Sequence, residues 1–301
     1  MQNSLLALVL LTQAPAAGPA AKDPEYVRAF HRGDYRGAKA LAAERVQAVP
    51  DDASARLLLA RAEAAMGRFD AAYAGFREAQ RRHPRHPDAL YYLGVTAGVM
   101  AQVEYERLLK LAPGSARAHQ LRGRNYAAQG RNADAEVEFE AALAAGPPSA
   151  EVLVALGDLE RANSAFAEAR ERYARAIDLA PSDYDALYGL GVCDSFAGDH
   201  ARAIESFRRA LGVAPGSAPA LLALGISLLQ TGRAQDAAAE LEKAARLEPR
   251  MRQAHYQLGR AYQLLGRAQE SEAAFARARE LLLEERQTDA AHPDLKPEPR
   301  E

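Results

Sequence analysis

The sequence has few of the residues that support covalent cross-linking or thiol chemistry. Its 301 residues include no tryptophan and a single cysteine, Cys193, so an intrachain disulfide is excluded and pairing does not reveal the redox compartment. Cys193 falls within a predicted helix, where a small buried thiol is the simplest interpretation. A reactive thiol would need a neighbouring cation or histidine, and His200 is the only such residue nearby in the sequence.

An excess of one charge is also missing. The sequence contains 38 Lys and Arg residues and 40 Asp and Glu residues, for a formal net charge of -2. It therefore predicts neither nucleic acid nor an anionic membrane as a partner. His83 and His86 are near each other, but Pro84 separates them and no third metal ligand is evident.

The sequence contains none of the common catalytic patterns. It has no phosphate-binding glycine loop, no Gly-x-Ser-x-Gly turn, no helix with paired histidines and an acid, and no spaced cysteine ligands. No stretch is left over for a separate catalytic domain. We therefore predict that the protein is not an enzyme and that it holds no metal and no cofactor.

What the sequence does have is a repeat of 34 residues. Three columns of residues recur with this period. The first is glycine, at Gly123, Gly157, Gly191, Gly225 and Gly259, and the second is a large, mostly aromatic residue, at Phe139, Tyr173, Phe207, Leu241 and Phe275. The third is proline, at Pro147, Pro181, Pro215 and Pro249. Within one unit, apolar residues at helical spacing are interrupted at Gly198 and Asp199 and end at Pro215. This period predicts helix pairs that stack, because one pair alone cannot bury its apolar face.

The pattern L-G-x-x-Y, then A-x-x-x-F-x-x-A and a proline, resembles the tetratricopeptide repeat family. The resemblance covers roughly residues 20 to 286 and implies an all-α fold, a right-handed superhelical solenoid of about eight helix-turn-helix units. The predicted units are residues 19–52, 53–86, 87–115, 116–149, 150–183, 184–217, 218–251 and 252–285. The family displays a concave binding surface, and its partners vary widely.

Two of the predicted units are irregular. The first is degenerate, as expected for a terminal cap whose outer face has no neighbour. In the third, Pro113 follows Pro84 by only 29 residues, so five residues are missing between Gly94 and Tyr105. Either two helices meet in a tight turn at Gly98, or one bent helix runs from about Asp88 to Leu111. We interpret the loss as a tolerated distortion rather than a functional kink.

The two ends of the chain differ from the repeats. The apolar run of residues 5–11 is too short to span a membrane and suits a secretory signal within residues 1–21, although no Lys or Arg precedes it. We predict a periplasmic or secreted protein without an integral membrane span; a cytoplasmic location is the alternative. Residues 287–301 are polar and proline-rich and predict a disordered tail. The leucines at 281–283 either pack back along their helix pair or form a patch for a partner or a second copy.

The family resemblance also implies where a partner binds. In each unit, positions 2, 5, 9 and 12 of the first helix point into the concave groove. The partner-binding residues so predicted are Arg61, Tyr91, Arg117, Gln120, Arg124, Tyr188, Val192, Leu222, Ile226, Leu229, Tyr256 and Arg260. The same positions hold Glu151, Val154, Asp158, Arg161 and Asp185. The groove would be polar and partly basic in its front half and apolar over the sixth and seventh units, which suits a peptide with apolar anchors.

These observations predict a non-enzymatic scaffold that binds a partner protein or peptide and helps to assemble an envelope or exported complex. A cytoplasmic regulatory adaptor or co-chaperone is one alternative. The family's two-carboxylate clamp for chaperone termini is not filled here, since Asn125 is off phase by one and no inner lysine accompanies it. The other alternative is an envelope structural protein that self-associates through its end leucines.

Overall fold

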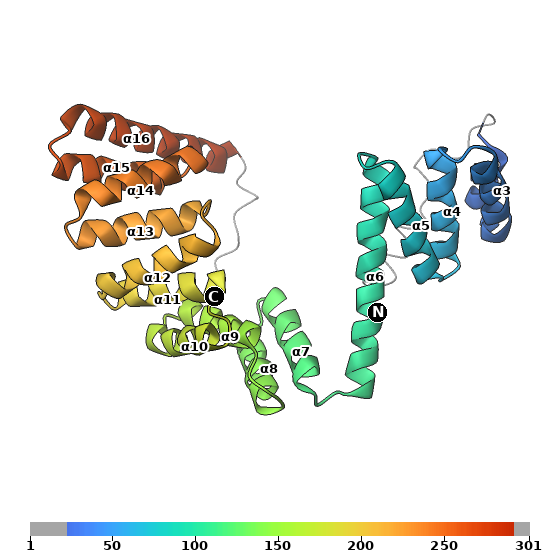
Figure 1. Ribbon diagram of the computed structural model, residues 1–301, viewed down its shortest axis with the longest axis horizontal. Coiled ribbons are helices and arrows are strands. Elements are labelled where there is room, and N and C mark those ends of the chain that lie inside the picture. The colour runs from blue at the N-terminus through green and yellow to red at the C-terminus, as the bar shows by residue number, and fades with distance from the viewer. Residues whose placement is uncertain (1–22, 292–301) are drawn as a thin grey trace. The chain divides into compact units, whose positions relative to one another are not determined.

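The structure is a computed structural model that describes residues 23–291, so the predicted signal segment, residues 1–21, lies outside it. The described residues form helices and turns without a strand (Figure 1), which confirms the all-α prediction. They divide into two compact units, one ending at Pro113 and the other beginning at Gly114. The sequence predicted a solenoid over residues 22–286, and the two units within it are each described separately.

The first unit contains five described helices, each packed on the next. They are α2 (Glu25–His31), α3 (Tyr35–Ala48), α4 (Ala53–Ala65), α5 (Phe69–Arg82) and α6 (Pro87–Leu111). Helix α2 has only seven residues, in keeping with a degenerate first unit. Buried Phe76 packs with small neighbours such as Ala60 and Ala72. The unit is therefore held together by large side chains set among alanines.

Helix α6 answers the question left open for the shortened third unit. It is one helix of 25 residues, and both Gly94 and Gly98 lie inside it. In the described part of the chain, the turn glycines of other units have φ between +72° and +79°, at Gly33, Gly67, Gly130, Gly198, Gly232 and Gly266. No residue of α6 has a positive φ. The missing residues remove the turn, so the helix continues, and Tyr105 stays 44% exposed instead of packing against Gly94.

The second unit continues the alternation of first and second helices. The first helices are α7 (Ala116–Ala128), α9 (Ala150–Ala162), α11 (Tyr184–Phe196), α13 (Ala218–Gln230) and α15 (Arg252–Leu264). The second helices are α8 (Asn132–Ala144), α10 (Phe166–Leu179), α12 (His200–Val213), α14 (Ala234–Leu247) and α16 (Ala268–Ala291). Helix α16 continues to Ala291, so the polar tail predicted from residue 287 begins inside a helix.

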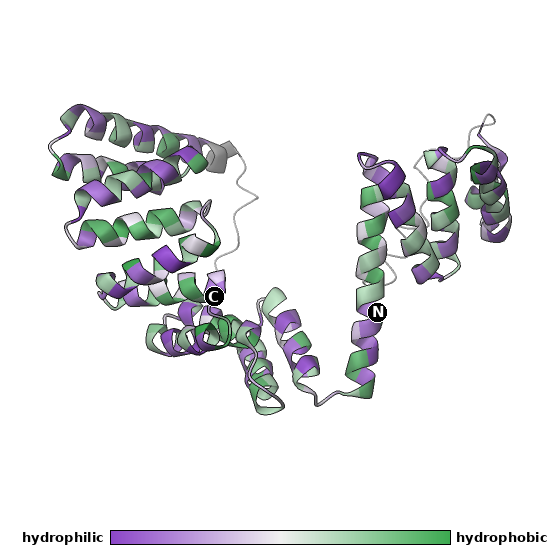
Figure 2. Cartoon of the chain, viewed as in Figure 1, coloured by the Kyte–Doolittle hydropathy of each residue, from purple (hydrophilic) through white to green (hydrophobic). Residues whose placement is uncertain are grey.

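Contacts between neighbouring repeats place the first helices side by side. Helices α9, α11, α13 and α15 touch one another in sequence, whereas the second helices of the described chain have no comparable mutual contacts. Helix α13 is central in this row and is apolar around most of its circumference, as Figure 2 shows. Helices α9, α11, α13 and α15 therefore form one wall of the second unit.

The glycine column of the repeat has a direct structural explanation. A Cβ atom built at Gly123, Gly157, Gly191, Gly225 or Gly259 would lie 2.5 to 2.8 Å from an atom of Phe139, Tyr173, Phe207, Leu241 or Phe275, respectively. Each large side chain thus occupies the space above the glycine of its own helix pair. The two columns depend on each other, which is why they recur with the same period.

Candidate partner-binding surface

The predicted groove residues are divided between the two units. Arg61 and Tyr91 belong to the first unit, and the other ten belong to the second. The guanidinium of Arg61 lies between the rings of Phe30 and Tyr92, 4.6 and 5.0 Å from their centroids, and so joins α2, α4 and α6. Burial lowers the pKa of Arg61. Arg61 therefore holds three first helices together, while Tyr91 is 48% exposed.

The polar part of the predicted surface is a hydrogen-bonded chain across α7 and α9. Gln120, only 6% exposed, donates from Nε2 to Oε2 of Glu151 at 2.7 Å and accepts from Nη1 of Arg117 at 2.6 Å. Arg124 lies 3.8 Å from the same Glu151 oxygen. Gln120 thus joins two repeats, whereas Arg117 and Arg124 remain exposed to solvent.

A second polar group contains Asp158, Arg161 and Tyr173. The Tyr173 hydroxyl donates to Oδ1 of Asp158 at 2.7 Å, and Nη2 of Arg161 donates to the same oxygen at 3.1 Å. Burial is the main cause that raises the pKa of Tyr173, although the hydrogen bond from Arg161 opposes it. Asp158 therefore has two donors from its own helix pair.

Asp185, at the start of α11, differs from Asp158 because no hydrogen bond or ion pair to its side chain is found within residues 23–291. Loss of hydration, followed by the negative charges of Asp183 and Asp158, raises the pKa of this carboxyl. Its negative charge is thus uncompensated by a cation of the described chain.

Beside Asp185 lies a set of half-buried side chains that we call the apolar patch: Tyr188 and Val192 on α11, and Leu222 and Ile226 on α13. The Tyr188 ring stacks on Tyr184, with centroids 5.9 Å apart, and is tilted against buried Phe207 at 5.7 Å. Val192 and Leu222 also pack against the core that contains Phe207. The patch is therefore supported from below and only partly covered.

The remaining predicted residues have structural surroundings of their own. Leu229 is 8% exposed and belongs to the core rather than to the surface. Tyr256 is 48% exposed, and its ring lies 5.6 Å from that of Phe275. Nη1 of Arg260 donates to Oε1 of Gln257 at 3.1 Å. Within the second unit, the structure brings together the predicted residues of α11 and α13, which are helices in contact.

Three features of the described chain concern its thiol, metal binding and membrane insertion. Cys193 is 1% exposed, and burial raises the pKa of its thiol to about 11, so the thiol is neutral near pH 7. No group of three or more His, Cys, Asp or Glu side chains within residues 23–291 is placed to hold a metal ion. None of the described helices combines the length and the apolar character needed to cross a membrane.

Sequence reasoning missed one pocket, between α12 and the turn that joins α13 to α14. Its signal in the sequence is a leucine, Leu228, in a column that holds Tyr126, Glu160, Asp194 and Tyr262 in the other regular units.

Comparison with known proteins gives a family and a fold. One sequence model of the tetratricopeptide repeat matches residues 101–150, 154–218 and 222–290, and a second matches residues 29–93 and 197–245. No curated protein matches the chain.

The similar solved structures include a crystal structure of MamA, at 24% identity and a TM-score of 0.52, which covers 55% of this chain and 96% of that one. Another is MamA, residues 41 to the end, from Desulfovibrio magneticus RS-1, at 18% identity and a TM-score of 0.53, with 58% and 97% covered. At these identities the similarity establishes the fold alone.

Proposed function

Because this chain belongs to the tetratricopeptide repeat family, we propose that it is a non-enzymatic scaffold that holds a partner protein or peptide on the first helices of its second unit. The observation that carries this proposal is the apolar patch of Tyr188, Val192, Leu222 and Ile226. All four side chains are half-buried, and Tyr188, Val192 and Leu222 pack against the core around Phe207. A partner that covers them gains apolar contact without reordering the scaffold.

The charge beside the apolar patch indicates what the partner carries. Asp185 has no cation of the described chain to pair with, and Asp158 adds a second negative charge nearby. A lysine or arginine next to apolar anchors would therefore pair with Asp185 when the anchors bind. We expect the partner segment to combine two or three apolar side chains with an adjacent cationic one.

We also propose that the protein works outside the cytoplasm, in the assembly of an envelope or exported complex. The support is the apolar run of residues 5–11 and the small residues that follow it. Fusing the first 25 residues to a reporter that is active only after export tests the location. A fusion that stays inactive would favour the cytoplasmic adaptor instead.

The binding proposal is tested by crosslinking in the native cell. A photo-crosslinking residue placed at 222 should capture a discrete partner, and one placed at Val137, which is 69% exposed on α8, should not. The double substitution Tyr188→Ala with Ile226→Asp should remove the captured product while the chain stays folded.

The matched control for this double variant is Val137→Ala with Val213→Asp. These two valines are 69% and 45% exposed on second helices, so the control makes the same kinds of change on another face. Equal capture by both double variants would place the binding surface elsewhere on the protein.

A further inference from the structure

One pocket of the second unit is lined by residues other than those of the apolar patch. It has a volume of about 570 Å³ and is formed by α12 and by the turn between α13 and α14. Its apolar lining is Ala201 and buried Ile204, and its polar lining is Glu205, Arg208, Arg209, Thr231 and Arg233. Three guanidinium groups around one pocket indicate a site for a negatively charged ligand.

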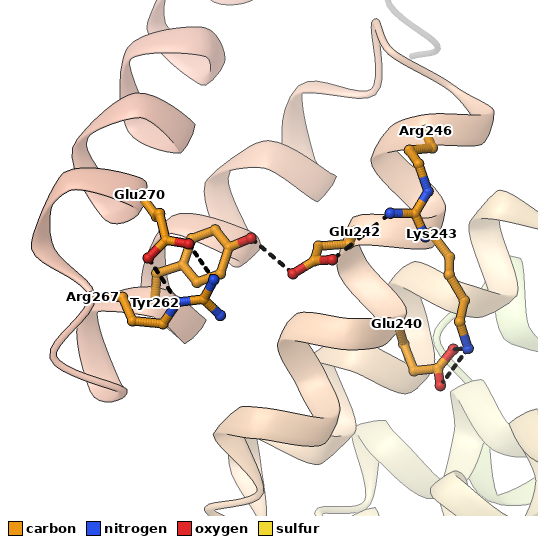
Figure 3. A network of polar contacts seen from close by, with 7 residues as sticks. All are labelled: Glu240, Glu242, Lys243, Arg246, Tyr262, Arg267 and Glu270. Carbon is orange, nitrogen blue, oxygen red and sulfur yellow. Dashed lines mark hydrogen bonds and ion pairs between the residues drawn. The ribbon is translucent and has the colours of Figure 1, made fainter.

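In the next repeat, a side chain of the protein itself occupies the space equivalent to this pocket. Thirty-four residues on, the equivalents of Arg208 and Arg233 are Glu242 and Arg267. There the ring of Tyr262 lies under the Arg267 guanidinium, 4.4 Å from its Cζ atom, and the Tyr262 hydroxyl donates to Oε1 of Glu242 at 2.9 Å (Figure 3). A phenol ring thus bridges the two positions.

In the pocket, the same positions lack this bridge. Leu228 stands where the next repeat has Tyr262, and it is 1% exposed and cannot reach either arginine as a phenol does. Arg233 donates to Asp236 at 2.8 Å, as Arg267 does to Glu270, but no aromatic ring lies under it in the described chain. Arg208 stands at the position that Glu242 has in the next repeat. The side chain that would meet the phenol hydroxyl is therefore positive instead of negative.

The arginines of the pocket differ in how far they are already engaged. Arg209 donates to the carbonyl oxygen of Pro181 at 3.4 Å, and Arg233 is paired with Asp236. No hydrogen bond or ion pair to Arg208 is found within residues 23–291. Because Glu205 adds a negative charge at the rim, the site suits a ligand with one or two negative charges rather than a polyanion.

We propose that this pocket binds an aromatic side chain next to a carboxylate, presented by an acidic segment of a partner protein. The ring lies under Arg233 as Tyr262 lies under Arg267, and the carboxylate pairs with Arg208. This second binding site is separate from the apolar patch, and it selects the opposite charge.

The test uses fluorescein-labelled pentapeptides and fluorescence anisotropy. Gly-Glu-Tyr-Glu-Gly should bind saturably to the full chain, and alanine in place of tyrosine or lysine in place of both glutamates should weaken binding at least tenfold. Arg208→Glu should also weaken it at least tenfold. Arg175→Glu, which changes an exposed arginine of α10 outside the pocket, is the control and should leave binding unchanged.

A triple variant gives the pocket the residues that occupy the equivalent positions of the next repeat. Ile204→Ala, Arg208→Glu and Leu228→Tyr together copy Ala238, Glu242 and Tyr262 of the next interface, so folding should be retained, as checked by thermal unfolding. Binding should be lost in this variant. Unchanged binding in the combined variant, or no saturable binding of the acidic tyrosine peptide to the native chain, would overturn the proposal.

Two further measurements test whether the ligand is a protein segment and whether it binds in this pocket. Free 4-hydroxyphenylacetate should compete more weakly than the unlabelled peptide; tighter binding of the free acid would overturn a protein segment as the ligand. Tyr188→Ala with Ile226→Asp should leave peptide binding unchanged, since the apolar patch is a different surface. Loss of peptide binding in that variant would overturn the assignment to this pocket.

Discussion

Gly191 and Gly94 occupy the same column of the repeat but have different surroundings. A Cβ atom at Gly191 would lie 2.6 Å from Cε1 of Phe207, whose side chain is 1% exposed and enclosed by the core. A Cβ atom at Gly94, inside α6, would meet no atom within 4 Å. Replacing each glycine with alanine therefore tests the glycine–aromatic packing at one position and the continuous helix at the other.

The two substitutions should change stability in opposite directions. Alanine is favoured over glycine inside a helix by about 0.5–1 kcal/mol, so Gly94→Ala should stabilise the first unit by roughly that amount. The same gain applies at Gly191, but overpacking against the Phe207 ring costs about 1–3 kcal/mol or more. We therefore expect Gly191→Ala to lower the free energy of unfolding of the second unit by about 1–2 kcal/mol.

Hydrogen exchange followed by mass spectrometry is the suitable assay because it reports on each unit separately, whereas one global midpoint would mix them. Peptides from α6 should exchange more slowly in Gly94→Ala, and peptides from α11 and α12 should exchange faster in Gly191→Ala. A destabilised α6 would mean that Gly94 is packed like the other glycines and that α6 is not continuous there. Unchanged exchange in Gly191→Ala would refute the packing explanation of the two columns.

Three further predictions concern single side chains. Ser164 has φ +63° at a turn position where the other described turns have glycine, so Ser164→Gly should stabilise the second unit by about 1 kcal/mol, measured by urea denaturation. Burial, followed by the hydrogen bond to Glu242, raises the pKa of Tyr262 to about 12. Its contribution to stability should therefore be complete below about pH 10 and fall as the pH rises toward 12, and Tyr262→Phe should flatten that decline in thermal melts. Arg170 pairs with Asp194 at 2.6 Å, and the Asp194 side chain is 3% exposed, so Arg170→Met should cost about 2–3 kcal/mol in chemical denaturation, and Asp194→Asn in the same chain should recover part of it.

The sequence was sufficient to predict the helix pairs because their main packing rule is local. Gly191 and Phe207 are 16 residues apart and belong to one pair, so a column pattern reports their contact directly. The shortened third unit could not be decided in this way. Whether residues 94–105 turn or continue depends on the balance between a strained short turn and an exposed Tyr105, and both arrangements satisfy the pattern.

The candidate site was predictable only in part. The rule that positions 2, 5, 9 and 12 of a unit face the groove selects Tyr188, Val192, Leu222 and Ile226, which lie on two first helices in contact. It could not separate surface residues from residues that join repeats, because that depends on partners in other repeats. Gln120 is buried by a bond to Glu151, 31 residues away, and Arg61 lies between two rings.

The bonds between neighbouring repeats have a consequence for how the protein is made. Tyr184 bonds to Ser217 and Ser195 to Ser227, 33 and 32 residues along the chain. Since such contacts join near neighbours, a repeat can dock as soon as the next one has been synthesised, and no early segment has to wait for the end of the chain. Folding should therefore be rapid and should advance during translation, one helix pair after another.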